Sequence, residues 1–229
     1  MTIGAWANSR SAMVLAAGGT CWLLTIGYLA VQPFVAAAWV DPGYSFVSNT
    51  ISDLGNASCG PFVRPDGTEA YVCSPRHAVM NTAFIAVGAL TAAGAILARR
   101  WWPGGRVVTT GLGLVAAAGI GGVMVGLAPA DTNLPLHAAG ALLQVPGAVG
   151  MLLLGFATDK TGWPRILSLV CGTTATAACV LFLAGVHLGL GVGGMERLAF
   201  DTLTVWTGVL GAAVLRRTHL THRTAPAGG

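Results

Sequence analysis

Residues 78–106, AVMNTAFIAVGALTAAGAILARRWWPGGR, contain the pattern that decides the fold. Residues 78–98 carry no charged side chain, and the run is long enough for a helix to cross a hydrocarbon core of about 30 Å. Arginines and tryptophans then come together in residues 99–106, as is typical of a membrane interface. The stretch therefore predicts a membrane-spanning helix followed by a short turn.

Similar apolar runs recur along the chain, at Ser11–Val40, Val107–Ala128, Leu136–Ala157, Ile166–Leu188 and Leu198–Leu215. The last run is the shortest, and its helix can begin earlier, within the residues GGMERL. The runs are continuous, whereas the strands of a membrane barrel alternate polar and apolar residues. The sequence thus predicts an all-α, polytopic integral membrane protein with a bundle of six transmembrane helices.

Composition supports the same fold class. Charged residues make up 9% of the chain, against about 25% in a soluble domain, and the mean hydropathy is +0.71. The pI is near 9.0, but the basic residues stand in small groups at the ends of apolar runs. That distribution orients a membrane protein and argues against nucleic acid as a partner.

The basic residues also predict the orientation. One side of the six-span arrangement holds Arg10, Arg99, Arg100, Arg106, Lys160, Arg165, Arg216, Arg217 and Arg223, and the other holds Arg64, Arg76 and Arg197. By the positive-inside rule, both termini are cytoplasmic, and we expect a multi-pass protein of the plasma membrane. The expected division is a cytoplasmic N-terminus (residues 1–10), a six-helix domain (11–216) and a disordered cytoplasmic tail (217–229).

The only long connection is a lid loop, residues 41–77, which lies outside the cytoplasm in this arrangement. Within it, the polar stretch SFVSNTISDLGNASCG (45–60) stands between apolar runs. Cys59 and Cys73 both fall in the loop, on the oxidising side of the membrane, so we expect a disulfide between them. The loop is therefore predicted to fold as a lid, with Asp53 pointing toward the ends of the helices.

Polar residues from distant parts of the chain converge on the same end of the predicted bundle. The candidates for a ligand pocket are Ser52, Asp53, His77, Asn81, Asp131, His137, His187, Glu196 and Arg197. Ionisable groups near membrane spans are costly, and they usually serve a partner, an ion or a substrate. A structural interpretation stands beside this one: Asp53 can cap a turn, and Arg197 can pair with Asp201 one helical turn later.

Two motifs resemble a known family. Ser52-Asp53-Leu54-Gly55 follows the first span, and GLAPADTNLPLHAAGA carries Asp131 and His137. Both motifs are similar to those of the bacterial and archaeal membrane proteins grouped as domain of unknown function 998, and the ISD element is distantly similar to the FRAG/DRAM/Sfk-type membrane proteins. The resemblance covers residues 12–215. It implies a six-helix architecture and no established activity.

Several functions fit these residues. One is a protein that binds, senses or moves a lipid or small amphipathic molecule, with Arg76 or Arg197 available for an anionic head group. Another is a zinc-dependent intramembrane lipid hydrolase; its candidate ligands are His77, His137, Asp53 and Asp131. Haem between His77 and His137 is disfavoured, because both lie at helix ends.

The expected partners are membrane lipids. In addition, glycine-rich helix faces such as Gly122 and Gly126 permit close helix contacts, within the chain or in a homo-oligomer. Whether the protein is an enzyme stays open at this point.

Overall fold

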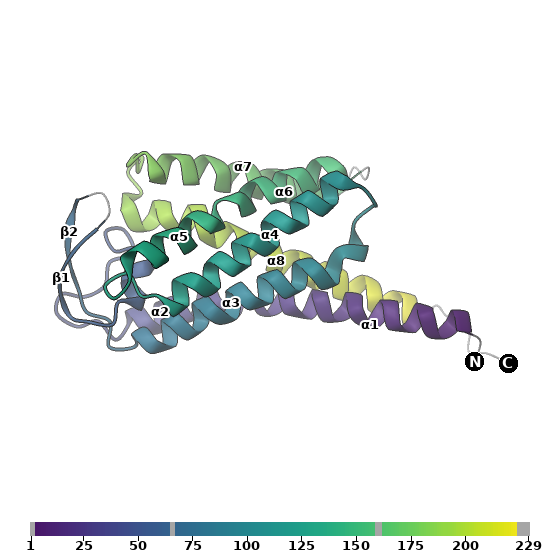
Figure 1. The fold of residues 1–229 in the computed structure, drawn as a ribbon, viewed down its shortest axis with the longest axis horizontal. Coiled ribbons are helices and arrows are strands. Elements are labelled where there is room, and N and C mark those ends of the chain that lie inside the picture. The colour runs from purple at the N-terminus through teal and green to yellow at the C-terminus, as the bar shows by residue number, and fades with distance from the viewer. Residues whose placement is uncertain (1–2, 65–66, 159–161, 224–229) are drawn as a thin grey trace.

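Among the residues that the structure describes, six helical segments are long and apolar enough to cross a membrane, which confirms the predicted fold class. The structure is a computed structural model that describes residues 3–64, 67–158 and 162–223. The helices are α1 (Ile3–Leu24), α2 (Gly27–Ala36), α3 (His77–Leu97), α4 (Arg106–Leu127), α5 (Leu134–Gln144), α6 (Pro146–Ala157), α7 (Trp163–Leu183) and α8 (Gly191–Arg223). Figure 1 shows them as one elongated bundle. A 3-10 turn, η2 (Ala98–Trp101), follows α3.

Two of the six spans are built from a pair of helices. In the first span, α1 and α2 are separated at Thr25, whose hydroxyl donates to the carbonyl of Trp22 at 2.6 Å and contacts the Thr207 hydroxyl of α8 at 2.8 Å. In the fourth span, α5 and α6 meet at Val145. Pro146 has no N–H to continue the hydrogen-bond ladder of α5, so the helix is interrupted there.

The two ends of the bundle differ, and we name them by what they carry. The lid end carries the lid loop, and the terminal end carries both chain termini (Figure 1). At the terminal end, Trp206 is fully buried between Trp22 and Trp102, with ring centroids 5.4 and 6.2 Å apart. Leu154 and Met151 of α6 complete this apolar cluster.

Helices α3 and α4 pack closely through glycine. A Cβ on Gly119 would lie 2.5 Å from the carbonyl oxygen of Gly88, so neither position accepts a side chain without separating the helices. Gly122 and Gly126 face the same helix, where a Cβ would meet Gly88 and Ile85. The glycine face predicted to make close helix contacts is therefore covered within the chain.

The lid loop contains a hairpin that the sequence analysis did not predict. Strands β1 (Gly60–Val63) and β2 (Glu69–Val72) pair antiparallel, with Gly60 opposite Val72. The predicted disulfide, Cys59–Cys73, is confirmed. It joins the residues directly next to the Gly60–Val72 pair, at the open end of the hairpin. Ahead of the hairpin, the 3-10 turn η1 (Ser52–Gly55) contains the SDLG motif.

The boundaries of the last two spans differ from the predicted ones. Helix α7 ends at Leu183, before the predicted Leu188, because Gly185, Leu188 and Gly189 adopt positive φ and turn the chain. Helix α8 begins at Gly191, just ahead of the GGMERL stretch in which the helix was expected to begin, and continues to Arg223. The segment expected to be a disordered tail thus begins as helix, and residues 224–229 lie outside the described part.

Candidate functional site

Asp53 organises the polar turn of the lid loop. Its side chain is 1% exposed, and its carboxylate accepts hydrogen bonds from the Thr50 N–H at 2.9 Å and from Asn49 Nδ2 at 3.3 Å. Arg64, directly after β1, donates to the same carboxylate at 2.5 Å. A buried carboxylate requires such partners. The charge pair therefore ties the turn to the hairpin.

Glu196, near the start of α8, holds η1 from the other side. It is 6% exposed. One carboxylate oxygen accepts from the N–H of Ile51, and the other accepts from the Ser52 hydroxyl at 3.2 Å. The last span thereby contacts the loop that follows the first span.

Arg197 fixes the segment ahead of η1. Its guanidinium donates to the carbonyl oxygens of Phe46 at 3.2 Å, Asn49 at 3.3 Å and Gly193 at 2.9 Å, and to the Tyr44 hydroxyl. It also lies 4.6 Å from the centre of the Phe46 ring. These contacts leave the guanidinium directed at the loop.

The expected pairing of Arg197 with Asp201 does not form. Instead, Gln32 of α2 lies between them: its Oε1 accepts from Arg197 Nε at 3.1 Å, and its Nε2 donates to both Asp201 oxygens at 2.9 Å. Gln32 is 3% exposed and was not predicted as a site residue. The Gln32 amide thus bridges Arg197 and Asp201, whereas their spacing in the sequence suggested a direct ion pair.

Tyr44 completes the anchoring of the polar turn. Its hydroxyl donates to the carbonyl oxygen of Thr50 at 2.7 Å, and its ring packs edge-on against Trp39. Burial raises the pKa of Tyr44 well above the usual range of a phenol. The side chain therefore acts as a neutral hydrogen-bonding group.

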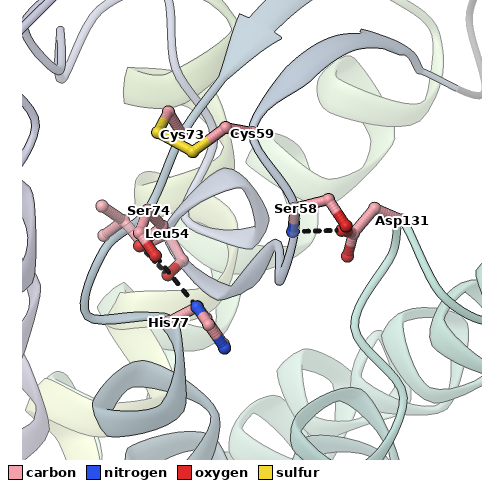
Figure 2. Close-up of a disulfide and its surroundings, with 7 residues drawn as sticks. All are labelled: Leu54, Ser58, Cys59, Cys73, Ser74, His77 and Asp131. Carbon is pink, nitrogen blue, oxygen red and sulfur yellow. Dashed lines mark hydrogen bonds between the residues drawn. A yellow bond between two sulfur atoms is a disulfide. The ribbon is translucent and has the colours of Figure 1, made fainter.

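Asp131 binds backbone of the lid loop. Its two oxygens accept from the backbone N–H groups of Ala57 at 3.0 Å and Ser58 at 2.7 Å; the second contact is drawn in Figure 2. The α4–α5 connection is in this way joined to the segment just before the disulfide.

His77 and Asn81, at the start of α3, also hold backbone. His77 Nδ1 donates to the carbonyl oxygen of Ser74 at 3.0 Å (Figure 2), and Asn81 Nδ2 donates to that of Gly55 at 2.9 Å. The Ser74 hydroxyl in turn donates to the Leu54 carbonyl at 2.7 Å. The structural interpretation fits these two residues.

His137 of α5 lies between the helices and η1. Its Nδ1 is 2.8 Å from the carbonyl oxygen of Ala128, and its Nε2 is 3.0 Å from Ser52 Oγ. The side chain is 6% exposed. Both ring nitrogens are thus engaged, one with backbone and one with a side chain of the lid loop.

Beneath the lid loop is a cavity of about 400 Å³ between α5, the end of α7 and the start of α8. Its polar lining comprises Thr50, Ser52, Asp53, Arg64, His137, His187 and Glu196. The apolar lining includes Ala138, Leu142, Val145, Phe182 and Phe200. Of the predicted site residues, the structure brings Ser52, Asp53, His137, His187 and Glu196 to this cavity, and it places His77, Asn81, Asp131 and Arg197 outside its lining.

The four predicted zinc ligands do not form one cluster. Within residues 3–64, 67–158 and 162–223, no three His, Cys, Asp or Glu side chains gather closely enough to hold a metal ion. The physical reason is that Asp131 and His77 bind backbone of the lid loop, whereas Asp53 pairs with Arg64.

Arg64 and the two phenylalanines, Phe182 and Phe200, are cavity residues that the sequence analysis missed. A signal for Arg64 existed, since it is one of few basic residues on its side of the predicted membrane. Phe182 and Phe200 carried none, because an aromatic residue in an apolar run does not indicate which face it occupies.

The comparisons with known proteins agree with the resemblance found in the motifs. No curated protein and no solved structure matches the chain. The family described as "Protein of unknown function (DUF998)" matches residues 23–213, which contain about half of the first span, the other five spans in whole or in large part, the lid loop and both motifs. The similarity to FRAG/DRAM/Sfk-type proteins stays a prediction. The chain belongs to this DUF998 family of multi-pass membrane proteins.

Proposed function

We propose that the cavity under the lid loop binds a lipid or a small amphipathic molecule. Sensing or moving that molecule would depend on this binding. The observation that carries the proposal is the mixed chemistry of the lining. Hydroxyl, imidazole and carboxylate groups line the cavity together with aromatic and aliphatic side chains. Its volume of about 400 Å³ lies within the range of about 300–1,000 Å³ of small-molecule sites.

The apolar part supports entry from the bilayer. Leu142 and Leu183 line the cavity and are also 57% and 59% exposed, so the cavity reaches the lipid-facing surface between α5 and α7. Phe182 and Phe200 pack edge-on, with ring centroids 6.2 Å apart. An acyl chain can lie against them while the head group points toward Ser52.

The polar part favours an uncharged or cationic head group. Asp53 and Arg64 form an ion pair, whereas Glu196, the other acidic side chain of the lining, accepts hydrogen bonds from Ile51 and Ser52. Arg76 and Arg197, considered at first for an anionic head group, are both engaged elsewhere. Arg76 donates to the carbonyl oxygen of Phe34 at 2.6 Å, and Arg197 holds the turn ahead of η1.

We further propose that the lid end faces outward and the terminal end faces the cytoplasm of a cell bounded by the plasma membrane. The basic residues of the terminal end, Arg99, Arg100, Arg106, Arg165, Arg216 and Arg217, support this orientation. The disulfide supports it too, because disulfides persist in oxidising compartments. The side chains of Lys160 and Arg223 lie outside the described part.

Binding is tested by filling the cavity. Ala138 is half-buried and lines the cavity, whereas its neighbour Ala139 is exposed and does not line it. We expect Ala138→Trp to abolish capture of a photoreactive diacylglycerol in vesicles, and Ala139→Trp to leave it unchanged. The crosslinked peptide of the wild-type protein should contain residues of α5, α7 or α8. Equal capture by the two variants would contradict the proposal.

A further inference from the structure

The contact between Ser52 and His137 has the geometry of a nucleophile and its general base. Ser52 Oγ lies 3.0 Å from His137 Nε2, and both side chains line the cavity. We propose that these two residues form a catalytic pair that cleaves the ester bond of a lipid bound there. The inference deepens the proposed function and rests on the cavity being a lipid site.

The hydrogen bond on the far side of the imidazole determines its tautomer. Nδ1 lies 2.8 Å from the carbonyl oxygen of Ala128, and a carbonyl oxygen can only accept. Nδ1 therefore carries the hydrogen, and the lone pair of Nε2 faces Ser52 Oγ. This is the tautomer that removes a proton from a serine hydroxyl, and the backbone carbonyl orients the ring as a carboxylate does in a catalytic triad.

The fold holds the serine in a defined position. Ser52 begins η1, and η1 is fixed on both sides by the Asp53 carboxylate and by Glu196. His137 belongs to α5, which is joined to the lid loop through Asp131 as well. The two reacting groups come from separate elements that are tied together, as the pre-organisation of a catalytic pair requires.

Glu196 introduces a competition for the one hydrogen of the Ser52 hydroxyl. Its Oε1 lies 3.2 Å from Ser52 Oγ, on a carboxylate that also accepts from Ile51. When the hydroxyl donates to Glu196, it does not donate to His137. The pair is active when the serine hydrogen points to Nε2, so Glu196 governs how often the nucleophile is activated.

The reaction follows from these positions. As Ser52 Oγ attacks the ester carbonyl carbon, its proton moves to His137 Nε2, and a C–O bond forms. The bond to the leaving alcohol then breaks, and Nε2 returns the proton to the alcohol oxygen. Water then attacks the acyl–serine ester, and Nε2 takes one of its protons. The bond between the acyl carbon and Ser52 Oγ breaks, and Nε2 returns the proton to Oγ, which releases a carboxylic acid and restores the serine.

The test uses the purified full chain in detergent and an alkyl fluorophosphonate as the probe. Ser52 Oγ displaces fluoride from phosphorus in the same way as it would attack an ester. We expect the probe to label the wild-type protein, with the label located on Ser52 by peptide mass spectrometry. Ser52→Ala should lose the label, and Ser58→Ala, an exposed serine of the same loop, should keep it.

Two further variants separate catalysis from simple anchoring of the loop. In His137→Asn, the shorter amide can still donate to Ala128, but no base faces Ser52; labelling should slow by about 10²-fold or more. In Glu196→Gln, the amide oxygen can accept from Ile51 while the amide nitrogen donates to Ser52 Oγ. The serine hydrogen is then left to His137, and labelling should accelerate.

The outcomes distinguish this inference from the proposed function. Lipid capture by the wild-type protein without labelling of Ser52 would overturn the catalytic pair and leave the binding site standing. Labelling that is equally fast in His137→Asn would overturn the role of the base. Loss of labelling in Glu196→Gln would assign the base to Glu196 and overturn the pair as drawn here. Absence of both capture and labelling would overturn both proposals.

Discussion

At the terminal end of the bundle, Trp22, Trp102 and Trp206 pack ring against ring among aliphatic side chains. At the lid end, the buried residues include Asp53 and Glu196, and each is held by hydrogen bonds to the loop. Apolar packing tolerates few alternatives in shape, whereas a hydrogen-bonded loop can detach from its partners one contact at a time. We infer that the stability of the bundle depends mainly on the terminal end, whereas ligand access depends on the lid end of the same helices.

The largest expected effect comes from the terminal end. Trp206→Ala removes the ring at the centre of the tryptophan cluster, and truncating a buried tryptophan costs about 3–5 kcal/mol. We expect that loss in the free energy of unfolding, measured by denaturant titration in micelles. Trp163→Ala, at a residue 51% exposed, is the control and should change the value little. Similar losses in both variants would show that burial in the tryptophan cluster does not determine the cost.

Breaking the disulfide should affect the lid end alone. The chain segment between Cys59 and Cys73 spans a separation of 14 residues, and closing a loop of about 15 residues is worth about 3 kcal/mol. In the Cys59→Ser/Cys73→Ser variant, we expect faster amide exchange in residues 60–72 and an unchanged exchange rate in α4. Faster exchange throughout the bundle would show that the ends are not independent.

A smaller effect is expected where the lid loop docks on α8. A Cβ at Gly193 would collide with the carbonyl oxygen of Asn49, and overpacking of this kind costs about 1–3 kcal/mol. Gly193→Ala should therefore raise amide exchange in residues 45–53. Gly194→Ala has the same gain in helix propensity, and its Cβ would meet only the Leu190 side chain at 3.2 Å. If amide exchange in residues 45–53 is the same in both variants, the close contact at Gly193 does not determine the stability of the docked loop.

The smallest effect concerns Tyr44. Tyr44→Phe removes the hydrogen bond to the Thr50 carbonyl, which is worth about 1 kcal/mol. Because burial raises the pKa of Tyr44, the folded lid retains the phenol proton that the unfolded chain loses above about pH 10. Lid stability should therefore fall as the pH rises beyond that value, and the fall should be smaller in Tyr44→Phe. If amide exchange in the lid loop depends on pH in the same way in the wild-type protein and in Tyr44→Phe, Tyr44 is not the source of this pH dependence.

The sequence was sufficient for features that depend on local composition. Hydropathy placed the first four spans within four residues at each end and the last two within seven, and the two loop cysteines predicted the disulfide. The hairpin was missed because β1 and β2 have only four residues each, and their sequences, GPFV and EAYV, do not alternate polar and apolar residues. The interruption after α1 was missed because it depends on a contact between Thr25 and Thr207, which lie in different spans.

The site shows the same limit. Sequence position predicts which polar residues lie at the helix ends, but the directions of their side chains follow from tertiary contacts. His137 turns toward Ser52 because Ala128 holds its other nitrogen, whereas His77 at a similar helix position binds the Ser74 carbonyl. Spacing along one helix gives no information about Gln32, which joins α2 to two charged residues of α8.

The hydrogen bond from Ile51 to Glu196 joins residues 145 positions apart. During translation at about 5–20 residues per second, the lid loop is made roughly 7–30 s before its last partner. Until then, the polar turn is solvated by water, while the disulfide can already form within the loop. A nascent chain that stops before α8 would have most of its spans and no closed cavity. Insertion of the final helix is therefore the step of biogenesis that completes the site.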